Sequence, residues 1–179
     1  MELRELQDVR DEGQPYDKVR LIELVVSVSA NGINAIDNLS LDYGATARGE
    51  LVQEHLNIWH DLSTSGSSPF GRTFVGKVDL SRIGTMGHSS GGEGVLFHYL
   101  LNKRLNTPFM VRAVLPLAAM NQKRLKVSGV PLGIVLPYCN GDLADLQGIH
   151  YYDDSRYALP GDPALARMAR GFMCPEHRL

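Results

Sequence analysis

Short apolar runs alternate with longer amphipathic stretches along most of the chain. Four runs have the length and composition of buried strands, at residues 21–29, 82–86, 110–117 and 132–138. Two longer stretches, 45–62 and 91–105, repeat apolar residues at helical spacing. Alternation of this kind is typical of α/β proteins with a parallel sheet. We therefore predict a mostly parallel sheet of about four or five strands, flanked by helices on both faces.

The segments between these elements carry turn and loop signals. Residues 34–44 are polar, and residues 63–69 are rich in serine and glycine, so both predict loops. Beyond residue 160 the pattern weakens, and only 164–170 fits a short helix. No internal repeat and no composition shift divides the chain, so residues 1–179 are expected to form a single domain.

Composition and charge exclude several classes of protein. The chain has 44% hydrophobic and 21% charged residues, close to the globular average, which argues against disorder or a collagen-like fold. Its formal net charge of −2 gives no electrostatic reason to expect a nucleic-acid or membrane-surface partner. The small basic group of Lys123, Arg124 and Lys126 is interpreted as a solvated loop.

The two cysteines and the N-terminal residues narrow the remaining possibilities. Cys139 and Cys174 make neither a disulfide framework nor metal-ligand spacing. The first residues contain no apolar stretch typical of a secretion signal, and no run approaches the length of a membrane span. We expect a soluble protein without a metal or an organic cofactor, and the sequence leaves its compartment open.

The most specific chemical signal is the segment from Gly87 to Gly91, Gly-His-Ser-Ser-Gly, which matches the nucleophile-elbow pattern G-x-S-x-G. A chance match is expected in only roughly 0.06 of chains of this length. The segment also lies between a predicted strand and a predicted helix, where such a serine projects above the sheet. We therefore predict that Ser89 is a nucleophile and that the Ser90 backbone N–H forms part of an oxyanion hole.

The alternative for this segment is a glycine-rich turn without chemistry, such as a phosphate cradle. Neither G-x-G-x-x-G nor a P-loop lysine is present, which disfavours that alternative.

A nucleophilic serine needs a base and an orienting acid, which follow in the order serine, acid, histidine in this kind of site. Asp142 comes just after the apolar run 132–138, at the sheet edge where ligand chemistry collects, with Asp145 as a close competitor. Only His150 and His177 follow Asp142. Chain order and freedom to reach the site favour His177 as the base, and His150 remains open. The pair Asp153 and Asp154 is interpreted as a solvated turn.

Residues 25–160 resemble bacterial serine hydrolases in the neighbourhood of cutinases and polyester hydrolases. The matching segments are VVSVSANGIN (25–34), ARGELVQEHLNIW (47–59), KVDLSRIGTMGHSSGGEGV (77–95), AVLPLA (113–118) and VPLGIVLPYCNGDLADLQGIHYYDDSRY (130–157). The resemblance implies an α/β-hydrolase fold, with Ser89 as the nucleophile and Asp142 as the acid. It also implies hydrolysis of small-molecule or polymeric carboxylic esters through an acyl-enzyme, and it points to secreted relatives.

Both ends of the chain depart from this family. Residues 1–20 lack the family's early strands and its His-Gly loop, and residues 161–179 lack the final strand and the loop that carries the catalytic histidine. A catalytically weak or inactive remnant that acts as a binding module is therefore the alternative to an active esterase. Because the family has a further strand between those at 21–29 and 82–87, its loss would leave backbone groups unpaired, and we predict a homo-oligomer.

Overall fold

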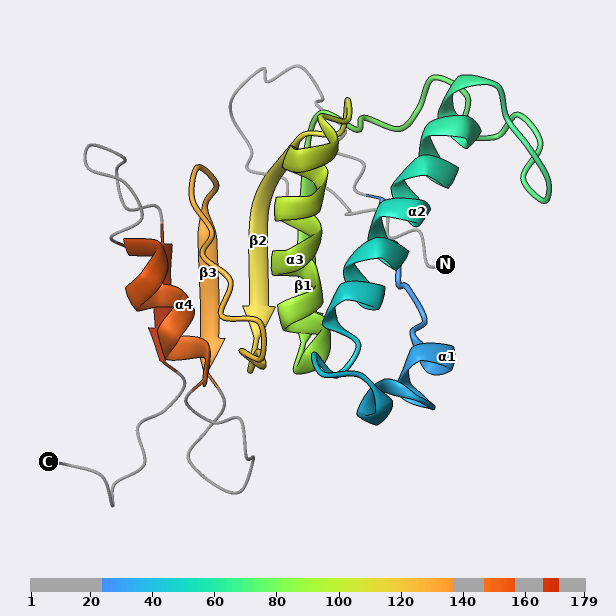
Figure 1. Ribbon diagram of the computed structural model, residues 1–179. Helices are drawn as coiled ribbons and strands as arrows, with labels where there is room; N and C mark the ends of the chain where they lie inside the picture. Colours follow the sequence, from blue (N-terminus) through green and yellow to red (C-terminus); the bar gives the residue numbers. More distant parts are fainter. Residues whose placement is uncertain (1–23, 137–146, 157–165, 171–179) are drawn as a thin grey trace, which may run out of the picture.

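The computed structural model describes residues 24–136, 147–156 and 166–170 (Figure 1). Its centre is a parallel sheet of four strands in the order β1-β2-β3-β4. The strands are β1 (Ile83–His88), β2 (Val111–Leu117), β3 (Leu132–Leu136) and β4 (Ala166–Arg170). This confirms an α/β architecture with a parallel sheet.

Three longer helices accompany the sheet, α2 (Ala45–Thr64), α3 (Ser90–Leu105) and α4 (Gln147–Arg156). A short helix α1 (Asn31–Asn34) and a 3₁₀ helix η1 (Asp37–Leu39) precede α2, within or beside the segment predicted to be a loop. The main core lies between α3, α4 and the sheet. It includes Leu96, Val114, Ile134 and Tyr151, which are almost completely buried. In the part of the chain that the structure describes, no helix is long and apolar enough to cross a membrane.

Helices α2 and α3 approach each other closely because glycines lie at their contact. A β-carbon added to Gly49 of α2 would lie 2.9 Å from the carbonyl oxygen of Gly94 and 2.5 Å from the ring of Phe97, both in α3. Side chains at these positions would force the two helices apart. The close contact fixes the start of α2 beside the start of α3, at the carboxyl edge of the strands (Figure 1).

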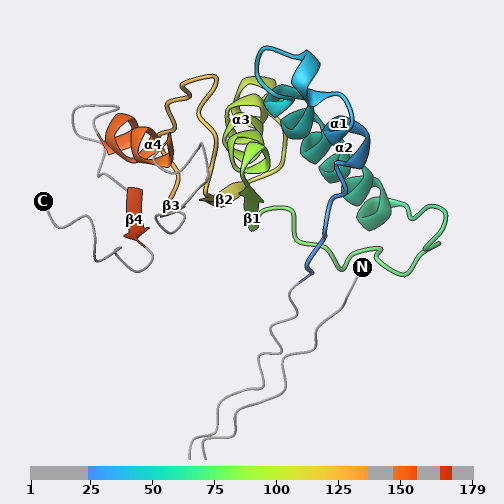
Figure 2. The same cartoon turned by 90° about the horizontal axis from the view of Figure 1, so that it is seen from below.

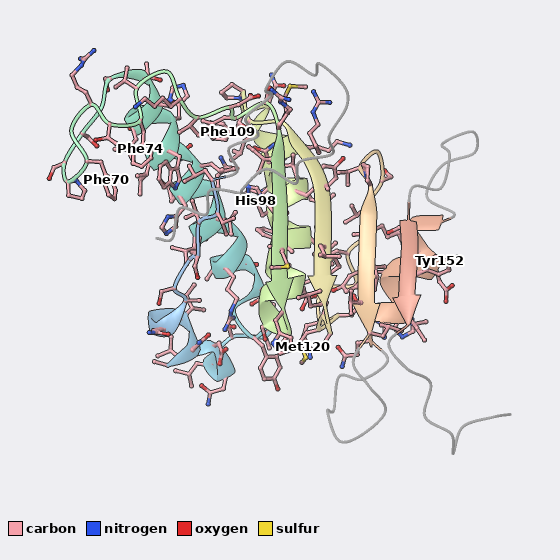
Figure 3. The ribbon with its side chains drawn as sticks, turned by 180° about the vertical axis from the view of Figure 1, so that it is seen from behind. Phe70, Phe74, His98, Phe109, Met120 and Tyr152 are labelled. Carbon is pink, nitrogen blue, oxygen red and sulfur yellow. The ribbon has the colours of Figure 1, made fainter. Side chains whose placement is uncertain are left out.

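The expectation of helices on both faces of the sheet is wrong for the described elements. Figure 2 shows α2, α3 and α4 on the same side of the sheet. The strand order runs in one direction without reversal. Since connections between parallel strands are almost always right-handed, successive crossovers then place their helices on the same face. Figure 3 looks onto the opposite face of the sheet, which no described helix covers. Met86 of β1 and Leu115 of β2 are exposed.

The strand predicted at 21–29 is also not found in its described part, residues 24–29. No described strand pairs with the outer edge of β1, and this segment does not pair with it either. Its side chains instead contribute to a second cluster, in which Leu24 and Val26 pack against Trp59 and its neighbours under α2. A nearly continuous apolar run thus led to packing of its side chains against α2, whereas a strand needs a neighbouring backbone as well.

Two predictions for the C-terminal part need correction. The segment that fitted a short helix contains strand β4, which pairs in register with β3 from Leu132↔Ala166 to Leu136↔Arg170. Pairing with the edge of an existing sheet satisfies its backbone and overrides a weak helical pattern. Asp153 and Asp154, predicted in a solvated turn, lie within helix α4, an element that the sequence pattern did not reveal.

His98 of α3 is a buried histidine that gives stability a pH dependence. It is fully inaccessible to solvent, neither ring nitrogen has a hydrogen-bond partner, and burial lowers its pKa to about 4. The unfolded chain binds a proton near pH 6.5, whereas the folded protein resists protonation. Between these values, the free energy of unfolding should therefore fall as the pH falls.

We predict that the lowered pKa of His98 alone reduces the free energy of unfolding by about 2–3 kcal/mol when the pH falls from 7 to 4.5. Urea unfolding of the parent and of His98→Leu at both pH values measures this contribution as the difference in pH dependence. His60→Leu, at an exposed position, is the control and should retain the parent dependence. An unchanged pH dependence in His98→Leu would contradict the assignment.

Self-association stays a prediction, now motivated by the uncovered face and by the outer edge of β1. Parallel sheets are normally covered on both faces, and Met86 on the edge strand β1 is 65% exposed. Sedimentation velocity at micromolar concentration should give a dimer or larger species, and Met86→Glu should shift it towards monomer. Leu105→Glu, an exposed apolar site at the end of α3, should not. If the parent protein sediments as a monomer of 19.7 kDa, the prediction of self-association is wrong.

Candidate active site

Ser89 lies between the last residue of β1 and the first residue of α3, where the sequence predicted an elbow. Its backbone angles, φ 55° and ψ −124°, fall in a region that residues with a side chain rarely adopt. The Ser89 N–H donates to the Leu117 carbonyl at 2.9 Å, and the Ser89 carbonyl accepts from the N–H groups of Gly92 and Met120. The turn therefore holds a strained serine in place by its neighbours, a feature that concentrates at functional sites.

Two of the glycines around Ser89 are required by close backbone approach. A β-carbon on Gly87 would lie 2.1 Å from the carbonyl oxygen of Gly91, and one on Gly92 would lie 2.7 Å from the β-carbon of Ala119. A β-carbon on Gly91 itself would meet nothing within 4 Å. The sharp reversal from β1 into α3 thus depends on Gly87, whereas Gly91 leaves open space beside the serine.

The first N–H groups of α3 are available to a negative charge. Ser90 begins the helix, so its N–H has no acceptor within α3, and it donates no hydrogen bond to any described residue. The helix runs for 16 residues, and its N-terminal dipole favours an anion at the same place. This geometry fits the predicted contribution of the Ser90 N–H to an oxyanion hole.

A buried carboxylate lies in the first turn of α3, next to the elbow. Glu93, in the first turn of α3, is fully inaccessible, and its Oε1 accepts the Lys123 N–H at 2.6 Å. Tyr151 of α4 donates its hydroxyl to the Met120 carbonyl at 2.5 Å. Burial, followed by the charge of Glu93, raises the pKa of this hydroxyl well above its usual range. Tyr151 therefore remains a neutral donor that fixes the segment after β2.

Lys123 connects this segment to the loop before α2. Its Nζ donates to Asp42 Oδ2 at 3.0 Å and to Thr46 Oγ1 at 2.9 Å. Burial tends to raise the pKa of the Asp42 carboxyl, but the hydrogen bonds from Thr46 and Lys123 outweigh it and hold that pKa below its usual range. Lys123 is thus an anchor between Asp42 and Glu93, and not the freely solvated charge that the sequence suggested.

The remaining predicted site residues are only partly described. Asp142, its competitor Asp145 and His177 lie outside the described residues. His150 is exposed on α4. Ser89 and Ser90 lie at the turn between β1 and α3, and the catalytic roles of Ser89, Ser90, Asp142 and His177 stay predictions.

Sequence reasoning missed the residues that support the elbow. Glu93 and Tyr151 lie on segments that look polar, and only the fold reveals that they are buried side by side. One signal was present, because Glu93 follows Ser89 by four residues and therefore lies one helical turn above it.

No model of a protein family matches the chain, and no curated protein matches it.

The two outer glycines of the motif give a matched pair of variants. Gly87→Ala places a methyl group against the Gly91 carbonyl and should destabilise the protein by about 1–3 kcal/mol or more. Gly91→Ala meets nothing and replaces a helical glycine, so it should leave stability unchanged or raise it by up to about 1 kcal/mol.

Urea denaturation of both variants beside the parent protein checks this pair. Equal stability of Gly87→Ala and Gly91→Ala would mean that the turn is looser than the structure indicates.

Proposed function

We propose that the protein is a serine hydrolase that cleaves carboxylic esters through an acyl-enzyme on Ser89. The observation that carries the proposal is the conformation of Ser89, held at a strand-to-helix turn with φ 55° beside the Ser90 N–H, which donates to no described residue. A serine in an allowed conformation would stabilise the same turn better, so the strained geometry favours a chemical role. The substrate is a small-molecule or polymeric ester.

The chemistry that follows has two acyl transfers. Ser89 Oγ attacks the ester carbonyl as its proton passes to a base, and the Ser90 N–H donates to the oxygen that gains negative charge. The carbon–oxygen bond to the alcohol breaks, and the alcohol leaves with that proton. Water then attacks the acyl-enzyme, releases the acid and restores Ser89. These steps use no metal and no organic cofactor.

The base and its orienting acid are assigned by chain order. We propose His177 as the base and Asp142 as the acid that orients it, with His150 as the alternative base on α4. A histidine fits this role because its unperturbed pKa, near 6.5, lets it accept and return a proton at neutral pH.

A second candidate function is that of a binding module which retains the elbow without turnover. What favours it is that residues 161–179 do not resemble the family segment that carries the catalytic histidine. Such a protein would fold and bind a ligand, yet hydrolyse no ester.

We expect Ser89→Ala to lower the rate of p-nitrophenyl butyrate hydrolysis by at least about a thousandfold. The free energy of unfolding should stay within about 1 kcal/mol of the parent value, because the hydroxyl supports no described contact. Ser90→Ala is the matched control, since it removes the neighbouring hydroxyl but keeps the backbone N–H, and it should retain most of the activity. Substantial turnover by Ser89→Ala would show that the nucleophile lies elsewhere.

A histidine base predicts that the rate rises with pH through roughly 6.5, because only the neutral imidazole accepts the serine proton. His177→Ala should abolish this rise together with most of the activity, and His150→Ala should not. The reverse result moves the role to His150. A profile that is flat between pH 5 and pH 8 in single-turnover acylation would contradict a histidine base.

A further inference from the structure

A cavity of about 500 Å³ lies between the segment after β2 and helix α4. The described residues that line it are Asn121, Gln122, Arg124, Gln147, His150 and Asp154. Its volume falls within the range of about 300–1,000 Å³ typical of small-molecule sites. Most such sites have apolar walls, whereas every one of these side chains is polar or charged. The cavity is therefore suited to a small polar ligand.

The groups that line the cavity have free hydrogen-bonding capacity of both kinds. Arg124 and Asp154 form no ion pair with any described residue, although both line the same space. The Asn121 Oδ1 is buried and has no hydrogen-bond partner. Arg124 can only donate, and Asp154 and the Asn121 oxygen accept. A ligand that satisfies all three must both accept and donate.

The cavity wall is fixed to the elbow by hydrogen bonds. The Met120 N–H donates to the Ser89 carbonyl at 3.2 Å, and the next residue, Asn121, donates its N–H to Gln147 Oε1 at 2.7 Å. Tyr151 holds Met120 from α4 at the same time. Figure 3 shows Met120 at the carboxyl end of β1, where the elbow begins. The residue that anchors Ser89 and the first lining residue of the cavity are thus adjacent in the chain.

We infer that this cavity binds the alcohol part of the ester and that this alcohol carries neighbouring hydroxyl groups, as glycerol and sugars do. The inference rests on the proposed ester hydrolysis and narrows its substrate class. A hydroxyl is neutral, accepts from Arg124 and donates to Asp154 or Asn121, whereas a singly charged group would be repelled by one of the two charges. In the reaction, the bond from Ser89 Oγ to the acyl carbon forms, the ester bond breaks, and the polyol leaves with the serine proton.

Three butyrate esters test the selectivity, since they share one acyl-enzyme and differ only in the alcohol: propyl, glyceryl and 6-glucosyl butyrate. The ratio of kcat/KM for a polyol ester to that for propyl butyrate should be about ten or more. Asp154→Asn and Arg124→Gln should each lower this ratio by about tenfold. Lys126→Gln, an exposed cation of the same loop outside the cavity, is the control. Equal rates for all three esters, or a ratio that both variants leave unchanged, would overturn the inference.

Binding to the Ser89→Ala protein separates the cavity from the catalysis. Glycerol and methyl glucoside are titrated and followed by NMR chemical shifts, and the one that binds more tightly identifies the source of the hydroxyl groups. Binding that Asp154→Asn weakens supports the polyol site, even if no ester is turned over, in which case only the proposed function fails. Absence of binding by both compounds overturns the polyol site, even if esters are hydrolysed.

Discussion

The turn from β1 into α3 is the constraint on which the rest of the site depends. The Gly87 backbone and the Gly91 carbonyl approach so closely that no side chain fits between them, and Ser89 takes up the reversal with a positive φ. The ladder of β1 with β2 continues to the Ser89 N–H, which donates to Leu117. The strain at Ser89, about 1–3 kcal/mol, persists because hydrogen bonds hold the residues on both sides of it.

A chain of polar contacts carries this constraint into the surrounding loops. Glu93 stands one helical turn above Ser89 and accepts from the Lys123 backbone, and the Lys123 side chain reaches Asp42 before α2. Loops that are far apart in the sequence are therefore held at the same edge of the sheet. Since a buried carboxylate without partners is costly, these contacts stabilise the protein and position the elbow together. The residues that stabilise the loops here are therefore also the residues that position the elbow.

The sequence predicted the parts of the fold that depend on local pattern. The three strands β1 to β3, helices α2 and α3, and the position of Ser89 between a strand and a helix all follow from periodicity and from one motif. The segment at residues 24–29 and strand β4 were mispredicted because pairing depends on which backbone is near, which a local pattern does not specify. Helix α4 and the burial of Glu93 were missed for the related reason that tertiary contacts, and not propensity, decide them.

The strand order explains the asymmetry of the molecule. Because the order never reverses among the described strands, right-handed connections place the helices on one face and leave the other to residues such as Met86. Because β1 and β2 are parallel, their carboxyl ends lie side by side, next to the first turn of α3. The elbow, the Ser90 N–H and the polar cavity then lie along one edge, outside the carboxyl ends of these strands.

The most direct test of the account is covalent labelling of the folded protein with a fluorophosphonate, which reacts with activated serines. Intact mass and peptide mapping should find one adduct, on Ser89, that forms in the native protein and is absent in urea and in Ser89→Ala. A slow reaction confined to Ser89 would still place the activated hydroxyl at the elbow. A folded protein that remains unlabelled, or that is labelled at another serine, would contradict the claim that this turn activates Ser89.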